Sequence, residues 1–243
     1  MIRTILLSGV MIVCGMMVMT GCNDPVTGPS DNRNVIFSEG FEGTLAAWEG
    51  VYMVNSEEMY RQMRITSDAA HGGNSSLTTD SNMTALYHRE GERFETGTVG
   101  VEFYLMATAT GKANFGVRMG QNPGSSGAVS PSFGIEFDPS DSIKCIFFTT
   151  WPANDIQTTI APIQPGKWYK CQVEINCEDS TATYYIDDKK VHTQTYTEDI
   201  GFYGIDQLLV FRGKYGKIPL DSEEGAKPYY VDDITFYTLK TAD

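Results

Sequence analysis

The segment Pro228-Tyr-Tyr-Val-Asp-Asp-Ile-Thr-Phe-Tyr237 places two acidic residues between aromatic and β-branched ones. Residues of those two kinds favour a strand. Strict alternation would put Asp232 on the same face as Ile234, so a carboxylate would enter the core. A β-bulge at Asp232-Asp233 avoids this, because the extra residue lets Val231 and Ile234 both point inward and turns one carboxylate sideways. We therefore predict a bulged strand at the end of the domain.

The start of the domain offers a partner for this strand. Val35-Ile-Phe-Ser-Glu-Gly-Phe-Glu-Gly43 reads as a short strand that runs into a turn carrying Glu39 and Glu42. Antiparallel pairing of the first and last strands would close a β-sandwich. The two ends of the domain are therefore expected to lie side by side.

Composition and strand spacing predict one all-β domain over residues 35–240. The chain has 243 residues, of which 41% are hydrophobic and 12% aromatic, and this is ample for one core. Short runs of β-forming residues alternate with Gly, Asn, Asp and Ser at the spacing typical of a two-sheet antiparallel β-sandwich. The other expected strands cover residues 51–55, 75–79, 85–89, 99–107, 115–119, 132–138, 143–150, 156–161, 168–177, 181–187, 190–196 and 207–212. Residues 57–64 could form a helical turn or an edge strand.

Three of these segments predict particular placements. In residues 99–107 the odd-numbered residues from Val99 to Leu105 are apolar, so they share one face and should enter the core. Asp187-Asp188 is expected to form a hairpin turn, because Asp tolerates positive φ better than most residues. Residues 208–211 are apolar on both faces, which indicates a central strand.

The first 21 residues have the pattern of a signal peptide. Arg3 precedes an apolar run that is somewhat short for a membrane span. Met19-Thr-Gly-Cys22 resembles the lipobox of bacterial lipoproteins, although Met19 stands where those sequences usually have Leu, Ala, Val or Ile. The resemblance implies that Cys22 is lipidated and that residues 22–34 form a polar tether. It implies a domain anchored by lipid in the bacterial cell envelope, on the periplasmic or outer-surface side; an ordinary signal peptide or an uncleaved anchor is the alternative.

The charge of the chain argues against some partners. Its 31 Asp and Glu residues outnumber its 18 Lys and Arg residues and give a net charge of −13, which becomes one unit more negative once Arg3 is removed. Nucleic acids and anionic bilayer surfaces both require basic patches. We therefore expect no nucleic acid partner.

Five motifs occur in an order that resembles the concanavalin A-like lectin/glucanase superfamily, with laminin-G-like domains and carbohydrate-binding modules the nearest in character. They are Phe41-Glu-Gly43 followed by Trp48, His71-Gly-Gly-Asn-Ser-Ser-Leu77, Gly166-Lys-Trp-Tyr-Lys-Cys-Gln-Val173, Tyr184-Tyr-Ile-Asp-Asp-Lys189 and Tyr230-Val-Asp-Asp-Ile234. The resemblance spans the whole domain. It implies a jelly roll of two antiparallel sheets, one of them concave, that binds a polysaccharide or another glycan.

The resemblance also implies a structural Ca²⁺ near the joined termini. Its ligands would be Glu42, one of Asp232 or Asp233, and backbone carbonyls around Glu39 and Gly40. Ca²⁺ takes six to eight oxygen ligands and readily combines carboxylates with carbonyls. The alternative is that these acids are solvated turn and bulge residues. The three histidines lie far apart in the sequence and lack the spacing of a zinc site.

An exposed aromatic side chain is the expected glycan platform, since sugar rings stack on flat faces while nearby polar groups bind hydroxyls. Trp151 is expected in a loop with Asn154 and Asp155, which makes these three the candidate ligand-binding residues. Tyr215 is a weaker candidate. Trp151 could instead pack over a sheet edge.

An acidic pair raises the possibility of catalysis. Glu136 and Asp138 alternate on one strand face and resemble the Glu-x-Asp-x-x-Glu strand of family 16 glycoside hydrolases. The final acid of that motif is here Asp141, and Pro139 is expected to end the strand before it. We therefore predict a non-catalytic carbohydrate-binding domain. The alternatives are a glycosidase or lyase on the same fold, or an adhesion lipoprotein that binds protein.

The three cysteines of the domain allow at most one disulfide. Cys171 and Cys177 are expected on one strand, about 20 Å apart at roughly 3.3 Å per residue, which is too far for a bridge. In an oxidising envelope, we predict that Cys145 pairs with Cys171 or Cys177 if their strands are neighbours.

Overall fold

The computed structural model describes residues 32–50, 63–79, 84–109, 114–121, 131–138, 140–150, 153–196, 202–212 and 229–240. The chain divides into two compact units, Met1–Asp31 and Asn32–Asp243, and all described residues belong to the second. The predicted signal peptide and Cys22 therefore lie outside the described residues. Within the ranges above, no helix is long and apolar enough to cross a membrane.

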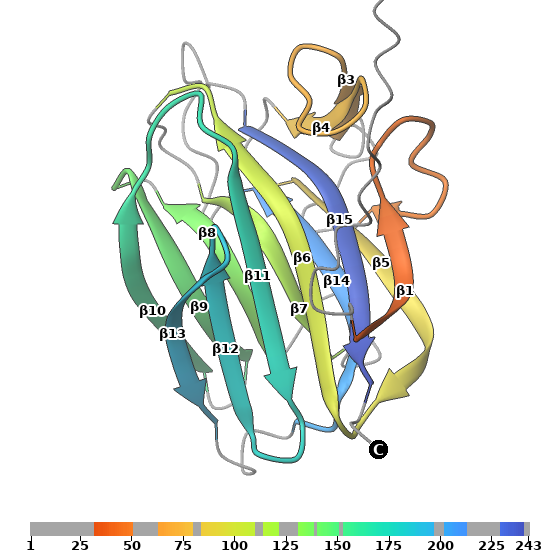
Figure 1. Ribbon diagram of the computed structural model, residues 1–243, viewed down its shortest axis with the longest axis vertical. Helices are drawn as coiled ribbons and strands as arrows, with labels where there is room; N and C mark the ends of the chain where they lie inside the picture. Colours follow the sequence, from red (N-terminus) through yellow and green to blue (C-terminus); the bar gives the residue numbers. More distant parts are fainter. Residues whose placement is uncertain are drawn as a thin grey trace, which may run out of the picture. The chain divides into compact units, whose positions relative to one another are not determined.

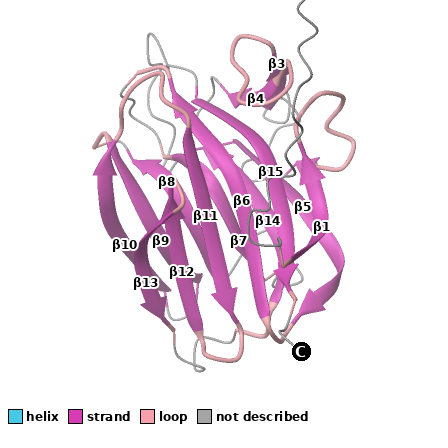
Figure 2. Ribbon diagram, in the orientation of Figure 1, coloured by secondary structure: helices cyan, strands magenta, loops and turns pink. Residues whose placement is uncertain are grey.

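The domain is an antiparallel sandwich of two sheets, called here sheet A and sheet B, and the described residues contain no helix (Figures 1 and 2). In spatial order, sheet A consists of β13 (Lys189–Thr195), β12 (Thr181–Ile186), β11 (Tyr169–Asn176), β6 (Thr98–Ala107), β15 (Tyr229–Leu239), β4 (Ser76–Thr79) and β3 (Met63–Thr66), with β1 (Arg33–Glu39) also paired to β15. Sheet B consists of β10 (Ala153–Pro162), β9 (Ser142–Thr150), β8 (Ser132–Asp138), β7 (Phe115–Gly120), β14 (Ile205–Arg212), β5 (Thr84–Phe94) and β2 (Glu49–Gly50). The predicted fold class is confirmed.

The first and last strands pair as predicted. β1 runs antiparallel to β15, with Val35 opposite Tyr237 and Glu39 opposite Ile234. The register of β15 against β6 shifts between Asp232 and Thr235, and Asp233 has a positive φ of 48°. These features define the predicted bulge, which lets both Val231 and Ile234 enter the core with no exposed surface.

The core lies between the two sheets and follows the alternation of the strands. Val99, Val101, Phe103 and Leu105 of β6 are all fully buried, as predicted. From sheet B, apolar side chains of β7, β8, β9 and β14 meet them in a single cluster. β14 lies between β7 and β5, so the predicted central strand is confirmed. The predicted strand 51–55 lies outside the described residues.

The predicted hairpin turn is confirmed. Asp187 and Asp188 have φ values of 49° and 62° and connect β12 to β13. Positive φ at both central residues matches the twist of the flanking strands. The Asp187 amide also donates a hydrogen bond to the Lys170 carbonyl, which fastens the turn to β11.

The disulfide prediction is wrong, because all three cysteines are free thiols. Cys145 belongs to β9 in sheet B, whereas Cys171 belongs to β11 in sheet A, so their strands are not neighbours. Cys177 follows the end of β11, and its thiol points to the carbonyl of Phe94. Burial raises the pKa of Cys145 to about 12 and that of Cys177 to about 11, so both thiols stay protonated at neutral pH.

Candidate functional site

The outer face of sheet B carries the predicted acidic pair, and the strand register arranges its side chains in rows. One row, called here the Gln207 row, runs across four strands through Gln207, Gly120, Ser132 and Phe148. The next row contains Leu209, Arg118, Gly134 and Ile146, and the third contains Phe211, Gly116, Glu136 and Lys144. The residues between these positions, such as Val117 and Ile135, point into the core. Glu136 therefore faces away from the core, as its strand pattern predicts.

Glu136 is held in a buried ion pair with Arg118. Arg118 Nε donates to Glu136 Oε1 at 2.6 Å, its Nη2 contacts the same oxygen, and Asn114 Nδ2 donates to Oε2 at 3.0 Å. The residue Glu136 has no exposed surface, and Arg118 is 7% exposed. The Arg118 guanidinium also lies 4.5 Å from the ring centre of Phe211 and 5.4 Å from that of Phe148. The negative charge of the Glu136 carboxylate is therefore balanced by Arg118, and both of its oxygens accept hydrogen bonds inside the protein.

Two glycines make room for this pair. A Cβ atom on Gly134 would lie 2.6 Å from Arg118 Cγ, and one on Gly116 would lie 2.9 Å from Glu136 Cγ. Each charged side chain therefore crosses over the glycine of the neighbouring strand. The sequence contains a signal for this arrangement. Phe115-Gly-Val-Arg118 and Phe133-Gly-Ile-Glu136 have the same pattern, an aromatic residue, a glycine and an aliphatic residue, and they end in opposite charges. Arg118 and Asn114 were not among the predicted site residues.

Asp138 is also engaged by partners. Its Oδ2 lies 2.8 Å from Lys144 Nζ, and its Oδ1 accepts the Ser140 amide at 2.8 Å. Burial acts to raise the pKa of Asp138, but the bonds from Lys144 and Ser140 outweigh it and hold the pKa below the usual value. β8 ends at Asp138, and Asp141 lies in the following turn with a φ of 61°. The third acid of the glycosidase-like motif therefore does not join the strand face, as predicted.

The predicted ligand-binding residues are only partly described. Trp151 and Tyr215 lie outside the described residues. Asn154 and Asp155 belong to β10 rather than to the expected loop, and their backbones pair with Thr149 and Phe148 of β9. Because Phe148 belongs to the Gln207 row, Asp155 is in register with that row at the edge of sheet B.

The predicted calcium ligands converge on the loop 71–75 at the joined termini. Glu42 Oε1 accepts the amides of Asn74 and Ser75 at 2.7 and 2.9 Å, and these bonds lower the pKa of Glu42. Asp232 Oδ2 accepts the amide of His71 at 2.8 Å, and its Oδ1 accepts the amide that follows it in the chain.

The bulge separates the environments of the two aspartates. Asp232 has no exposed surface, and burial outweighs its amide bonds and raises its pKa to about 6. Asp233 points outward, and its Oδ2 lies 2.7 Å from His71 Nδ1.

These contacts bear on the fit of a cation at the joined termini. The carboxylates of Glu42 and Asp232 accept hydrogen bonds from backbone N–H groups of the loop 71–75, and N–H groups repel a cation. In this arrangement the two carboxylates therefore cap the loop. Among the described residues, no group of three or more His, Cys, Asp or Glu side chains is placed to hold a metal ion. Calcium binding therefore stays a prediction.

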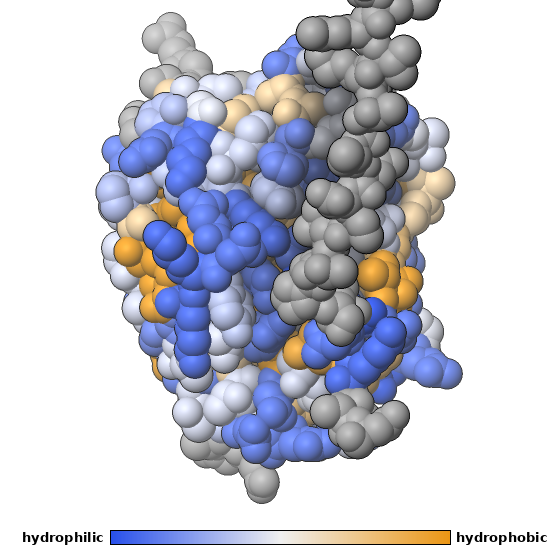
Figure 3. All heavy atoms as spheres, viewed as in Figure 1, coloured by the Kyte–Doolittle hydropathy of each residue, from blue (hydrophilic) through white to orange (hydrophobic). Residues whose placement is uncertain are grey.

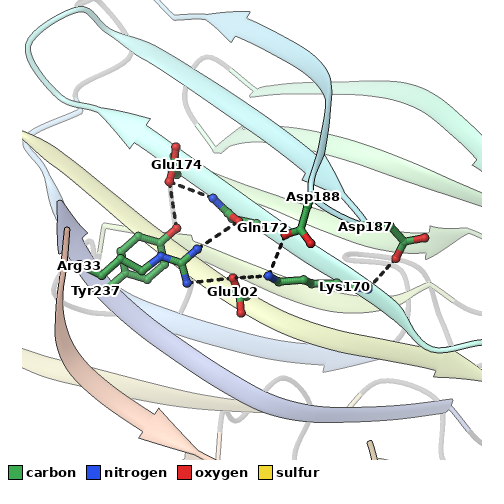
Figure 4. Close-up of polar contacts among 8 residues, drawn as sticks. All are labelled: Arg33, Glu102, Lys170, Gln172, Glu174, Asp187, Asp188 and Tyr237. Atoms are coloured by element: carbon green, nitrogen blue, oxygen red, sulfur yellow. Dashed lines mark hydrogen bonds and ion pairs between the residues drawn. The ribbon is translucent and has the colours of Figure 1, made fainter. Parts of the chain in front are cut away.

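The outer face of sheet A is different in character. Figure 3 shows polar side chains gathered over the middle of this face. Glu102 lies 2.9 Å from Arg33 and 3.2 Å from Lys170, which also contacts Asp188 at 2.7 Å (Figure 4). Gln172, Glu174 and Tyr237 extend the same network. Half-exposed ion pairs of this kind contribute little to stability.

No protein-family model and no curated protein matches the sequence. Solved structures match its fold. The globular domain of T. cruzi calreticulin has a TM-score of 0.60 at 11% identity and covers 84% of this chain and 87% of its own. The laminarinase catalytic domain from Thermotoga maritima has a TM-score of 0.56 at 12% identity, and the match covers 86% of this chain and 99% of that one. The Bacillus licheniformis β-glucanase has a TM-score of 0.57 at 13% identity, and the match covers 85% of this chain and 99% of that one. The chain therefore has the jelly-roll fold of concanavalin A-like proteins.

Proposed function

We propose that the outer face of sheet B binds a polysaccharide without cleaving it. Two of the structures with the same fold are named as a laminarinase and a β-glucanase, which act on glucans. The proposed face carries the half-exposed ring of Phe148 on β9. Tyr87 of β5, which is buried, lies on the same face with the Arg89 guanidinium 4.5 Å from its ring centre. Aromatic side chains beside polar ones are the usual means of binding sugar rings.

The observation that carries the non-catalytic assignment is the pairing of both acids. A glycosidase of the retaining or inverting type needs one carboxylic acid to donate a proton and one carboxylate free to act as nucleophile or base. Here Lys144 keeps Asp138 ionised, and Arg118 and Asn114 use both oxygens of Glu136. Neither Glu136 nor Asp138 is therefore placed to donate or accept a proton in a glycosidase reaction. A polysaccharide-degrading enzyme is the second candidate function, after non-catalytic glycan binding.

The test combines binding and cleavage on the full chain in detergent. A panel of soluble glucans, mannans, xylans and chitin oligosaccharides is assayed by calorimetry, and each ligand that binds is incubated for reducing-end release. We expect binding without release. Phe148→Ala should weaken binding about two- to twelvefold, since an aromatic contact contributes roughly 0.5–1.5 kcal/mol. Tyr185→Ala, a half-exposed aromatic change on sheet A, is the matched control.

Three results decide between the candidate functions. Release of reducing ends that Glu136→Gln abolishes would establish the enzyme. Loss of binding in Trp151→Ala would place the predicted tryptophan in the binding site. Absence of binding to every sugar would leave the third candidate, an adhesion domain that binds protein.

We also propose that Cys22 is lipidated and anchors the domain in the bacterial cell envelope. The proposal rests on the lipobox-like sequence before Cys22 and on the polar segment after it. Metabolic labelling with a radioactive fatty acid should mark the wild-type chain and not Cys22→Ser, and only the wild type should enter the detergent phase of Triton X-114. Equal labelling of both proteins would exclude Cys22 as the acceptor.

A further inference from the structure

Four aromatic side chains lie together on the outer face of sheet A, and we call them the His71 cluster. They are Tyr104 of β6, Trp168 just before β11, Tyr230 of β15 and His71 of the loop 71–75. The His71 and Tyr104 rings stack with their centroids 3.5 Å apart. The Trp168 ring lies 5.8 Å from that of His71 and 6.5 Å from that of Tyr230. Segments that are distant in the sequence therefore form one aromatic surface, where β6 ends and β11 and β15 begin (Figure 1).

The His71 cluster faces solvent, because the residues beside it in the chain fill the core. Neighbours such as Phe103 and Tyr169 are buried between the sheets, so strand alternation turns the cluster outward. Tyr104 and Trp168 are half-exposed, and His71 is exposed. The fourth ring of the cluster is buried. Three rings are therefore within reach of a ligand.

The polar atoms at the edges of these three rings make no hydrogen bond to another described residue, apart from one nitrogen of His71. Nδ1 of His71 is held by Asp233 Oδ2 at 2.7 Å, which fixes the ring and leaves Nε2 unused. The Tyr104 hydroxyl and the Trp168 Nε1–H are unused as well. The cluster therefore combines apolar ring surface with one donor from Trp168 and with hydrogen-bonding groups on the other two rings.

Several other aromatic side chains with a polar end have protein partners. On the same face, the hydroxyls of Tyr185 and Tyr237 both bond to Glu174. In the core, the Trp48 indole donates to Glu39. Tyrosine and tryptophan are enriched at binding surfaces, where the ring packs against a ligand and the polar end bonds to it. Three adjacent rings with unused polar ends therefore indicate a ligand-binding surface.

The charges around the cluster indicate the kind of ligand. The charged side chains that influence its two tyrosines electrostatically are Glu102, Asp188, Asp233, Lys170, Asp68 and Arg64. Acids predominate and the chain has a net charge of −13, so an anionic ligand is disfavoured. An ammonium group has donors only and would leave the Trp168 N–H unused. A sugar hydroxyl donates and accepts, so it suits both the Trp168 N–H and the Asp233 carboxylate.

We propose that the His71 cluster is a second glycan-binding site, which holds a neutral sugar ring on the face opposite to the one assigned above. The Trp168 and His71 rings meet at 70°, so a sugar that stacks on one ring has the other beside its hydroxyls. The inference goes beyond the proposed function, because a site on each outer face would let one domain hold two glycan chains. The two sites share no residue, so each can be tested without the other.

The fluorescence of Trp168 reports on this site directly. Of the three tryptophans, Trp48 is buried, so the variant Trp151→Phe keeps Trp168 as its half-exposed tryptophan. Acrylamide quenching of this variant, as the full chain in detergent, is measured with laminarihexaose, cellohexaose, mannohexaose and xylohexaose, and with hexagalacturonate and choline as charged probes. We expect at least one neutral oligosaccharide to protect Trp168 from quenching. The charged probes should leave the quenching unchanged.

Matched variants assign the protection to the cluster. His71→Ala in the Trp151→Phe background should weaken the affinity for the protecting sugar about two- to twelvefold, as expected for the loss of one aromatic contact. Tyr185→Ala removes another half-exposed ring from the same face and should leave this affinity unchanged. Phe148→Ala should also leave it unchanged, although that variant weakens binding on sheet B. Trp168→Ala, followed by calorimetry, is the second variant of the site, and thermal unfolding confirms that each variant is folded.

The outcomes separate this inference from the proposed function. Quenching that no neutral sugar reduces, together with calorimetric binding that Phe148→Ala weakens, would overturn the second site and leave the proposed function intact. Protection of Trp168, together with calorimetric binding that Phe148→Ala does not change, would support the second site and overturn the placement on sheet B. Protection that His71→Ala does not weaken, or that choline gives equally, would overturn the sugar site.

Two further results would also overturn the second site. A dimer in sedimentation velocity that Trp168→Ala dissociates, without sugar binding to the wild type, would show that a second copy of the chain occupies the cluster. Absence of binding to every sugar would overturn both proposals.

Discussion

Replacing Arg118 by Met should destabilise the domain strongly, because it leaves the Glu136 carboxylate buried and without its cation. Glu136 has no exposed surface and would keep only the Asn114 bond at 3.0 Å. Removing one member of a buried ion pair costs about 3–5 kcal/mol. For a domain of this size, about 2–4 °C of Tm correspond to each kcal/mol, so the expected fall is roughly 6–20 °C.

The double variant Arg118→Met with Glu136→Gln gives the sharper test. Gln keeps the shape of Glu136 and removes its charge, so the double variant should recover most of the lost stability. Differential scanning fluorimetry and urea unfolding of the full chain, with both single variants, complete a double-mutant cycle. Lys170→Met, which removes a half-exposed cation from sheet A, should cost about 1 kcal/mol or less.

Two results would contradict this reasoning. A cost for Arg118→Met no larger than that of Lys170→Met would mean that water reaches Glu136. A double variant as unstable as Arg118→Met alone would mean that the loss came from packing against Phe211 and Phe148 rather than from an unpaired charge.

Three further predictions concern the termini and the thiols. If calcium binds at Glu42, millimolar Ca²⁺ should raise the Tm, excess EDTA should reverse the rise, and Glu42→Ala should abolish it; an unchanged Tm would mean that the carboxylates hold the loop without a metal. Gly73→Ala should lower the Tm, since Gly73 has a φ of 61° and a Cβ there would collide with the Glu42 carboxylate, whereas Gly43→Ala, with open space, is its control. Cys145 and Cys171 should react with Ellman's reagent at pH 8 only after unfolding, because burial raises the pKa of both thiols; rapid reaction of the folded protein would contradict their burial.

The β-bulge at the joined termini was predictable because the acidic pair there interrupts the alternation of an otherwise apolar strand. An acidic pair inside an apolar strand has few solutions, and the bulge that places Asp232 inside and Asp233 outside is one of them. The Asp187-Asp188 turn was predictable for a similar reason, since backbone geometry limits which residues fit it. In contrast, β2 has two residues and β3 has four, which is too short for alternation to be visible.

What the sequence could not predict depends on which strands become neighbours. The disulfide prediction depended on Cys145 lying on a strand next to β11, and the assignment of β9 and β11 to different sheets is a long-range property of the chain. Similarly, Arg118 and Glu136 are 18 residues apart and meet only because β7 pairs with β8 in one particular register. A shift of one residue would send Arg118 into the core. Acidic pairs on a strand can therefore be identified from sequence, whereas their partners require the pairing of the strands.

The two outer faces of the sandwich differ in the burial and pairing of their polar groups, and this difference is one reason why we propose glycan binding on sheet B. On sheet A the charges are half-exposed and pair with one another, which adds little to stability. On sheet B an ion pair is buried, although apolar residues of the same volume would often be as stable or more so. Beside it, Gln207 and Ser132 are buried without partners, which lowers stability further. Packing alone favours none of these residues, and the face that bears their energetic cost is the one to which our proposed function assigns glycan binding.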